Sequence, residues 1–183
     1  LLAANGHIDA NVRMLRPSEL YAQPPHLFQN AGGGVFHDIA AAVGGGFAAP
    51  KVARGLACGD FDNDGDQDIL ITTNQGAPYL YRNDVTSGNK SLRLRLTGTK
   101  SNRDAIGAVV RLFTPDGQQM RTVKTGSSYL SQSELTLTFG LGQRAAADRI
   151  VVEWPSGRTD DFRSTKSGSY QLTEGGRLTL KTL

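Results

Sequence analysis

Five aspartates lie within nine residues of this chain, and this density of like charge constrains the segment more than any other feature of the sequence. They are Asp60, Asp62, Asp64, Asp66 and Asp68. Carboxylates crowded in this way repel one another unless a counter-ion lies among them. An acid at every second position, with a glycine for the sharp turn, suits calcium, which takes six to eight oxygen ligands. We therefore predict a Ca²⁺ site whose ligands are the side chains of Asp60, Asp62, Asp64 and Asp68 and the carbonyl of Asp66.

The helix-flanked calcium loop, the EF-hand, shares the first six positions of this pattern. It also requires a bidentate acid at its twelfth position, where this chain has Ile71. The flanking segments 55–58 and 69–73 are apolar and resemble strands. The pattern therefore predicts a strand, an ion loop and a second strand. The alternative is a solvated acidic turn without an ion, but Asx-turns account for two or three aspartates and not for five.

The rest of the chain predicts an all-β fold. There are 22 glycines, and short apolar runs separate them, while helical periodicity is confined to a turn or two near residues 17–21. From residue 89 onward, apolar and polar residues alternate, as in Ser91–Leu96, which has three leucines on one face. A turn at Pro115–Gly117 predicts a hairpin. With at least six such strands, the second half is expected to form an antiparallel β-sandwich or small barrel, with Trp154 in its core.

Charge and composition argue against several classes of function. Residues 1–88 contain five Lys/Arg and nine Asp/Glu, whereas residues 89–183 contain fifteen and eight, so an acidic half precedes a basic one. The cations are dispersed and few aromatic residues accompany them, so no nucleic-acid partner is expected. No apolar run is long enough to span a membrane. All three histidines lie in the first half, far in sequence from the serine-rich loop of the second, so no catalytic residues are predicted.

The first half contains an internal repeat. The segment 1–5 matches 70–74, and 25–30 matches 78–83, with 16 extra residues in the first copy, between His7 and about Pro24. One complete four-strand unit is expected over residues 26–73, with a partial unit on each side.

Residues 27–38 and 54–69 closely resemble the FG-GAP (VCBS-like) repeats of integrin-type β-propellers. The resemblance implies that residues 1–88 form the end of one blade, one complete blade and the start of the next. It also implies calcium bound by the aspartates of the loop. A propeller needs at least four blades, so we expect this chain to be part of a longer secreted protein, extracellular or periplasmic, with any signal peptide upstream of Leu1.

Residues 89–183 are expected to form a second domain. Two polar loops within it, at 98–107 and 125–133, resemble those of the ASPIC/UnbV domain, which follows FG-GAP repeats in secreted proteins. The side chains expected to face a ligand are Lys100, Asn102, Arg103, Asp104, Ser127, Ser128, Tyr129 and Gln132.

Two hypotheses of function follow. The first is a non-enzymatic, calcium-binding extracellular recognition or adhesion module, whose loops meet a protein or glycan. The alternative is an enzyme or biosynthetic accessory protein with a polar pocket between its two domains.

Overall fold

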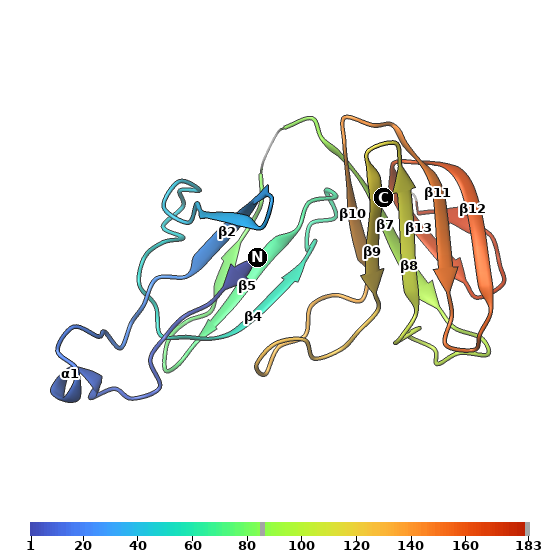
Figure 1. Ribbon diagram of the computed structural model, residues 1–183. Helices are drawn as coiled ribbons and strands as arrows, with labels where there is room; N and C mark the ends of the chain where they lie inside the picture. Colours follow the sequence, from blue (N-terminus) through green and yellow to red (C-terminus); the bar gives the residue numbers. More distant parts are fainter. Residues whose placement is uncertain (85–86, 182–183) are drawn as a thin grey trace. The chain divides into compact units, whose positions relative to one another are not determined.

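The structure is a computed structural model that describes residues 1–84 and 87–181. It contains fourteen strands and one helical turn, and its residues divide into two compact units (Figure 1). The first unit comprises Leu1–Cys58, Asp68–Arg82 and Gly126–Ser133, and the second comprises Gly59–Gln67, Asn83–Thr125 and Glu134–Leu183. The acidic loop therefore groups with the second unit, and the serine-rich loop groups with the first. The expected domain limits, 1–88 and 89–183, stay a prediction.

Two three-stranded sheets make up most of the first unit. They are ordered β1-β2-β3 and β4-β5-β6. The elements are β1 (Leu2–Ala3), α1 (Val12–Leu15), β2 (His26–Gly32), β3 (Val35–Asp38), β4 (Ala53–Gly59), β5 (Asp68–Thr73) and β6 (Tyr79–Tyr81). The matching segments of the repeat, β1 with β2 and β5 with β6, form antiparallel neighbours in both sheets. The strands expected in one blade over residues 26–73 thus fall in two different sheets.

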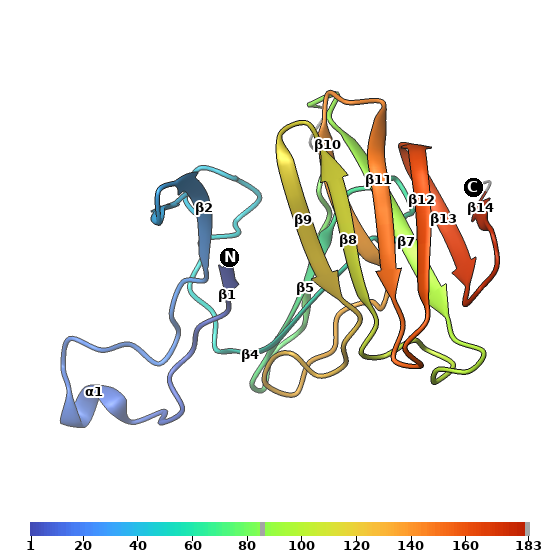
Figure 2. The ribbon, with the colours of Figure 1, turned by 45° about the vertical axis from the view of Figure 1, so that its right-hand side comes forward.

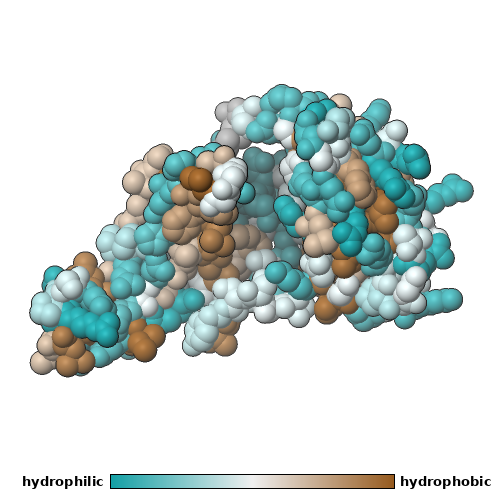
Figure 3. Space-filling model, in the orientation of Figure 1, coloured by the Kyte–Doolittle hydropathy of each residue, from teal (hydrophilic) through white to brown (hydrophobic). Residues whose placement is uncertain are grey.

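The extra residues of the first repeat copy form a long excursion that contains α1. Its base is held by a hydrogen bond of 2.9 Å from the amide of His7 to the carbonyl of Tyr21, and by a β-bridge between Gln23 and Lys51. Three large apolar side chains, Ile8, Met14 and Leu15, are exposed on this segment, and apolar residues are visible there in Figure 3.

Lys51 is buried in the first unit and organises the loop before it. Its ammonium group donates hydrogen bonds to the carbonyl oxygens of Gly46 (3.3 Å), Phe47 (2.9 Å) and Ala49 (2.7 Å). It also lies 5.0 Å from the centre of the Tyr79 ring. All three ammonium protons thus find acceptors, which explains how a lysine can be accommodated in this interior.

Substitution of Lys51 by methionine keeps the length of the side chain but removes all three donors. We expect a loss of about 1–3 kcal/mol in the free energy of unfolding of the first unit, because buried carbonyls lose their partners. Chemical denaturation followed by circular dichroism measures the loss. The exposed Lys124 gives the matched control, Lys124→Met, for which almost no change is expected.

The second unit consists of two four-stranded sheets packed face to face. One is ordered β10-β7-β13-β14 and the other β12-β11-β8-β9, and Figure 2 shows the second as a continuous layer. The strands are β7 (Lys90–Thr97), β8 (Val109–Thr114), β9 (Gly117–Thr122), β10 (Leu137–Gly142), β11 (Ala146–Glu153), β12 (Thr159–Lys166), β13 (Gly168–Thr173) and β14 (Leu178–Leu180). Within the described residues neither sheet closes into a barrel, so of the two predicted alternatives the second unit forms the sandwich.

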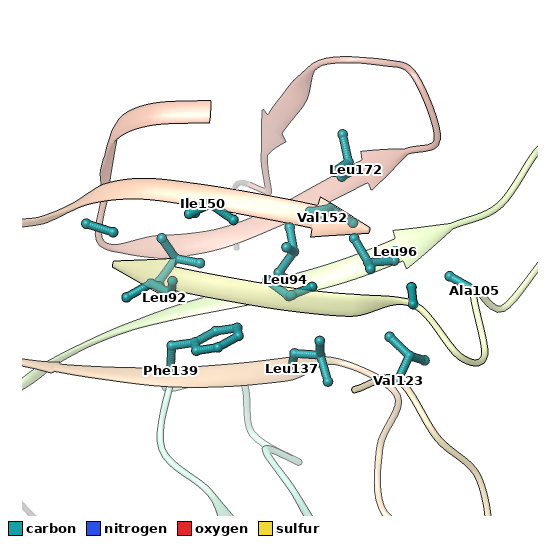
Figure 4. Close-up of a cluster of buried hydrophobic side chains, with 14 of the residues drawn as sticks. Leu92, Leu94, Leu96, Ala105, Val123, Leu137, Phe139, Ile150, Val152 and Leu172 are labelled. Carbon is teal, nitrogen blue, oxygen red and sulfur yellow. The ribbon is translucent and has the colours of Figure 1, made fainter. Parts of the chain in front are cut away.

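The core of the second unit draws on both sheets. Leu92, Leu94 and Leu96 of β7 point into it, as the alternation predicts, and meet Phe139 of β10 (Figure 4). Val110 of β8 and Ile150 of β11 face them from the other sheet. The hairpin predicted around residues 115–117 is confirmed by the antiparallel pairing of β8 and β9.

One feature of the sandwich corrects the expectation of an entirely antiparallel domain. β13 pairs with β7 in parallel, with Leu172 opposite Leu96. Parallel neighbours need a long crossover connection, and here the chain between them forms the whole second sheet and β10. In the part of the chain that the structure describes, no helix has the length and apolarity needed to cross a membrane.

Candidate metal loop and the loops around it

The acidic loop connects β4 to β5, and the carboxylate of Asp60 organises its turn. One oxygen of this carboxylate accepts a hydrogen bond of 3.1 Å from the amide of Asp64, and the other accepts one of 2.9 Å from the amide of Gly65. Gly65 has a φ of 100°, in the region that favours glycine. Its carbonyl accepts a hydrogen bond of 3.0 Å from the hydroxyl of Ser91. The first aspartate therefore folds the loop back on itself.

Three of the five aspartates come together. Carboxylate oxygens of Asp60, Asp62 and Asp68 all lie within 4.8 Å of one another. Calcium–oxygen distances are about 2.3–2.6 Å, so two oxygens bound to one ion are separated by at most about 5 Å. The three carboxylates thus fit one calcium ion in spacing and in ligand chemistry.

The structure places the other two predicted ligands differently. Asp64 is exposed, and one of its carboxylate oxygens accepts a hydrogen bond of 2.9 Å from the amide of Asp66. This bond stabilises the turn. Neither carboxylate belongs to the group of three. The contribution of the Asp66 carbonyl stays a prediction.

A buried arginine lies against the loop. One terminal nitrogen of Arg93, on β7, is 2.5 Å from a carboxylate oxygen of Asp60, and the other is 2.7 Å from a carboxylate oxygen of Glu134. The side chain of Arg93 is 7% exposed, and that of Asp60 is fully buried. The guanidinium group of Arg93, on β7, thus neutralises part of the negative charge of the loop.

Glu134 contacts both ends of the loop. One of its oxygens accepts a hydrogen bond of 3.3 Å from the amide of Asp60 and one of 2.7 Å from the side-chain amide of Gln67. The same Gln67 donates to the hydroxyl of Thr138, on β10, at 3.2 Å. Sequence reasoning missed Arg93, Glu134 and Gln67. The only signal available was the contrast between an acidic and a basic half, which does not identify particular residues.

The predicted loop 98–107 is held by a carboxylate of its own unit. One oxygen of Glu174 accepts hydrogen bonds of 2.8 Å from each of three consecutive backbone amides, those of Thr99, Lys100 and Ser101. The other oxygen accepts hydrogen bonds from the hydroxyl groups of Ser101 and Ser156. Burial of Glu174 acts to raise its pKa, but these hydrogen bonds outweigh burial and hold the pKa far below its usual range.

The four residues expected to face a ligand in this loop have different roles. Asn102 both donates to and accepts from the backbone of Ile106, each at 2.8 Å, and Asp104 pairs with Arg95 at 3.1 Å. Lys100 and Arg103 are exposed. The backbone amides of Thr99, Lys100 and Ser101 are therefore all bonded to Glu174 within the same unit.

The serine-rich loop covers the edge of β4. The hydroxyl of Ser131 accepts a hydrogen bond of 2.8 Å from the amide of Leu56, and that of Ser133 accepts one of 3.1 Å from the amide of Cys58. These alternate amides face the open side of β4, which is an edge strand of its sheet. Such capping protects an edge strand from pairing with another chain. The predicted residues Ser127, Ser128, Tyr129 and Gln132 are all exposed.

The fold and the loop define a class: an all-β protein with a two-sheet sandwich and an acidic loop in which three carboxylates come together. Residues 98–178, which run from the loop after β7 to the start of β14, match the family model described as ASPIC and UnbV. The chain is also similar to cartilage acidic protein 1 of Mus musculus, with 33% identity over 103 residues, which cover 54% of this chain and 16% of that protein. For the Xenopus tropicalis protein of the same name the identity is 35% over 109 residues, which cover 57% and 16%. The matched region is thus less than a fifth of the length of these relatives.

Proposed function

We propose that this chain is a calcium-stabilised recognition module of a secreted protein and has no catalytic role. The observation that carries the proposal is the gathering of the Asp60, Asp62 and Asp68 carboxylates within 4.8 Å on one short loop. Oxygen-only ligand sets of this kind favour calcium or magnesium over softer metals. A single loop with acids at alternate positions does not impose an ideal octahedron, and this favours calcium, which tolerates irregular coordination, over magnesium.

The loop aspartates would hold the ion, with Asp60 already fixed in orientation by its hydrogen bonds to the turn. Asp64 and the Asp66 carbonyl are proposed to complete the ligand set after a local adjustment. When bound, the ion neutralises the remaining carboxylates and ties β4 to β5. Its role is therefore to rigidify the loop.

The recognition part of the proposal rests on the match to the ASPIC and UnbV family and on the exposed loops. Tyr129 is 66% exposed and Leu130 87% exposed at a turn whose base caps β4. A tyrosine displayed on an anchored turn suits contact with a protein or a glycan. Similarity to cartilage acidic protein 1 supports the proposal that the chain acts outside the cell. We also propose that the first half of the chain belongs to blades of the FG-GAP type.

Calcium titration of the whole chain tests the central claim. Extracellular calcium modules bind with a Kd of about 0.1–1 mM, so 10 mM calcium should stabilise the folded state by about 1.4–2.7 kcal/mol. For a chain of this length this corresponds to a rise in Tm of roughly 3–10 °C relative to a sample with chelator. Identical melting curves in calcium and in chelator would refute the proposal.

Substitution of Asp62 by asparagine should weaken calcium binding about tenfold or more, because one charged ligand is lost. Asp62 is exposed, so only a small change in Tm is expected in chelator. Isothermal titration calorimetry measures the affinity. The control is Asp148→Asn, which removes one exposed carboxylate of the second unit, away from the loop in sequence. If both variants bind calcium as tightly as the wild type, the site lies elsewhere.

A further inference from the structure

We propose that Arg93 and Glu134 are positioning residues for the calcium loop, so that the ion site depends on the β-sandwich as well as on the nine-residue loop. The inference rests on the proposed calcium site and adds two residues that lie outside any calcium-loop pattern. Both belong, with residues 59–67, to the second unit.

Glu134 joins the two ends of the loop. It accepts hydrogen bonds from the backbone at the first position, Asp60, and from the side chain at the eighth, Gln67. A single carboxylate thus holds the first and the eighth positions of the loop together. Loop ends held in this way lose less conformational freedom when an ion binds.

Arg93 fixes the carboxylate of Asp60. The Asp60 oxygen that contacts Arg93 also accepts a hydrogen bond from the amide of Gly65. In the described part of the chain, the other oxygen accepts one hydrogen bond, from the amide of Asp64. A carboxylate oxygen has two lone pairs, so the second oxygen retains one for an ion. Arg93 therefore selects which oxygen faces the ion. Partners of this kind orient metal ligands in other sites, and their loss typically weakens metal binding about 10- to 100-fold.

A purely electrostatic role for Arg93 predicts the opposite sign. A positive charge beside the loop repels a cation, so removal of that charge should strengthen calcium binding. Glu134 lies 2.7 Å from the same guanidinium and offsets its charge. The geometry, and not the charge, is therefore the reason to expect weaker binding when Arg93 is changed. Its Nε is buried with no hydrogen-bond partner in the described part of the chain, so the two terminal nitrogens alone bind the carboxylates.

The test compares calcium affinity in the whole chain for the wild type, Arg93→Lys and Arg93→Gln, by isothermal titration calorimetry with calcium chloride. Lysine keeps the charge but cannot reach two carboxylates with a planar pair of nitrogens. We expect Kd to rise about tenfold in R93K and up to about 100-fold in R93Q. The control is Arg95→Gln, on the same strand, which breaks the pair with Asp104 and should leave Kd unchanged.

An unchanged Kd in R93K, or a lower Kd in R93Q, would overturn the inference. A second readout works without the metal: in chelator, the amides of Asp64 and Gly65 should exchange with deuterium faster in R93K than in the wild type, because their acceptor is no longer held. Equal exchange rates would also overturn it. If the wild type binds no calcium but the exchange rates differ, the proposed function fails while the positioning role stands. If R93Q does not fold, R93K decides.

Discussion

Replacement of Phe139 by alanine is expected to lower the free energy of unfolding of the second unit by about 3–5 kcal/mol. Phe139 is fully buried between the two sheets, where it packs among the leucines of β7 (Figure 4). The loss combines the transfer of a large apolar side chain with the cavity left behind, since interiors of this density close up only in part.

Trp154, the only tryptophan, provides the measurement. It belongs to the same core, and its indole nitrogen donates a hydrogen bond of 2.8 Å to Asp160. Its fluorescence therefore reports unfolding of the second unit separately from the first. Phe113→Ala is the control, because Phe113 is half-buried and outside the core cluster, and should cost less. Equal losses in the two variants would show that the sandwich core is not packed as described.

The second large effect is expected at Glu174. Glutamine in its place puts an NH₂ group where the carboxylate now accepts hydrogen bonds from three backbone amides and three hydroxyl groups, so donors meet donors. We expect a clear fall in the Tm of the second unit for Glu174→Gln at neutral pH. The half-buried Glu153, which pairs with Arg111 at 3.1 Å, gives the control Glu153→Gln and should change Tm less, because it makes a single ion pair near the surface.

The effect of Glu174 should depend on pH, and its sign follows from the direction of the pKa. The folded state holds the pKa of Glu174 well below 4.5, so the ionised form stabilises the fold at any pH above 4.5. Below that pH the unfolded chain takes up the proton first, and the stabilisation is lost progressively with acid. The difference in Tm between wild type and E174Q should therefore be constant from pH 7 to about 5.5 and shrink toward pH 3. A difference that grows in acid would contradict the assignment.

Local patterns were sufficient to predict much of the fold. The period of two in Ser91–Leu96 predicts a half-buried strand, and β7 follows it. β12 escaped prediction because apolar and polar residues do not alternate along it. β12 has one apolar residue in eight, Phe162, and it lies at the edge of its sheet, where most of its residues are exposed. Its position comes from pairing with β11, which no local pattern encodes.

In the candidate site, too, contacts between residues close in sequence could be predicted, and contacts between distant residues could not. The turn of the acidic loop is set by contacts between residues close in sequence, because the Asp60 carboxylate accepts hydrogen bonds from the amides four and five residues later. The acidic loop could therefore be predicted from the sequence. The contacts with Arg93 and Glu134 join residues 33 and 74 positions from Asp60. On β7, Arg93 occupies a position that alternation assigns to solvent, and it is buried only because the loop covers it. The alternation of apolar and polar residues along a strand does not predict burial that depends on a segment distant in sequence.

The parallel pairing of β7 with β13 bears on how the chain is made. β7 is the first strand of the sandwich, yet one of its neighbours is supplied by residues 137–142 and the other by residues 168–173. During synthesis this strand must remain unpaired on one side until residues 168–173 have been made. Contacts so distant in sequence form slowly. The sandwich should therefore assemble late, and a premature stop before Gly168 would leave an apolar strand open to aggregation.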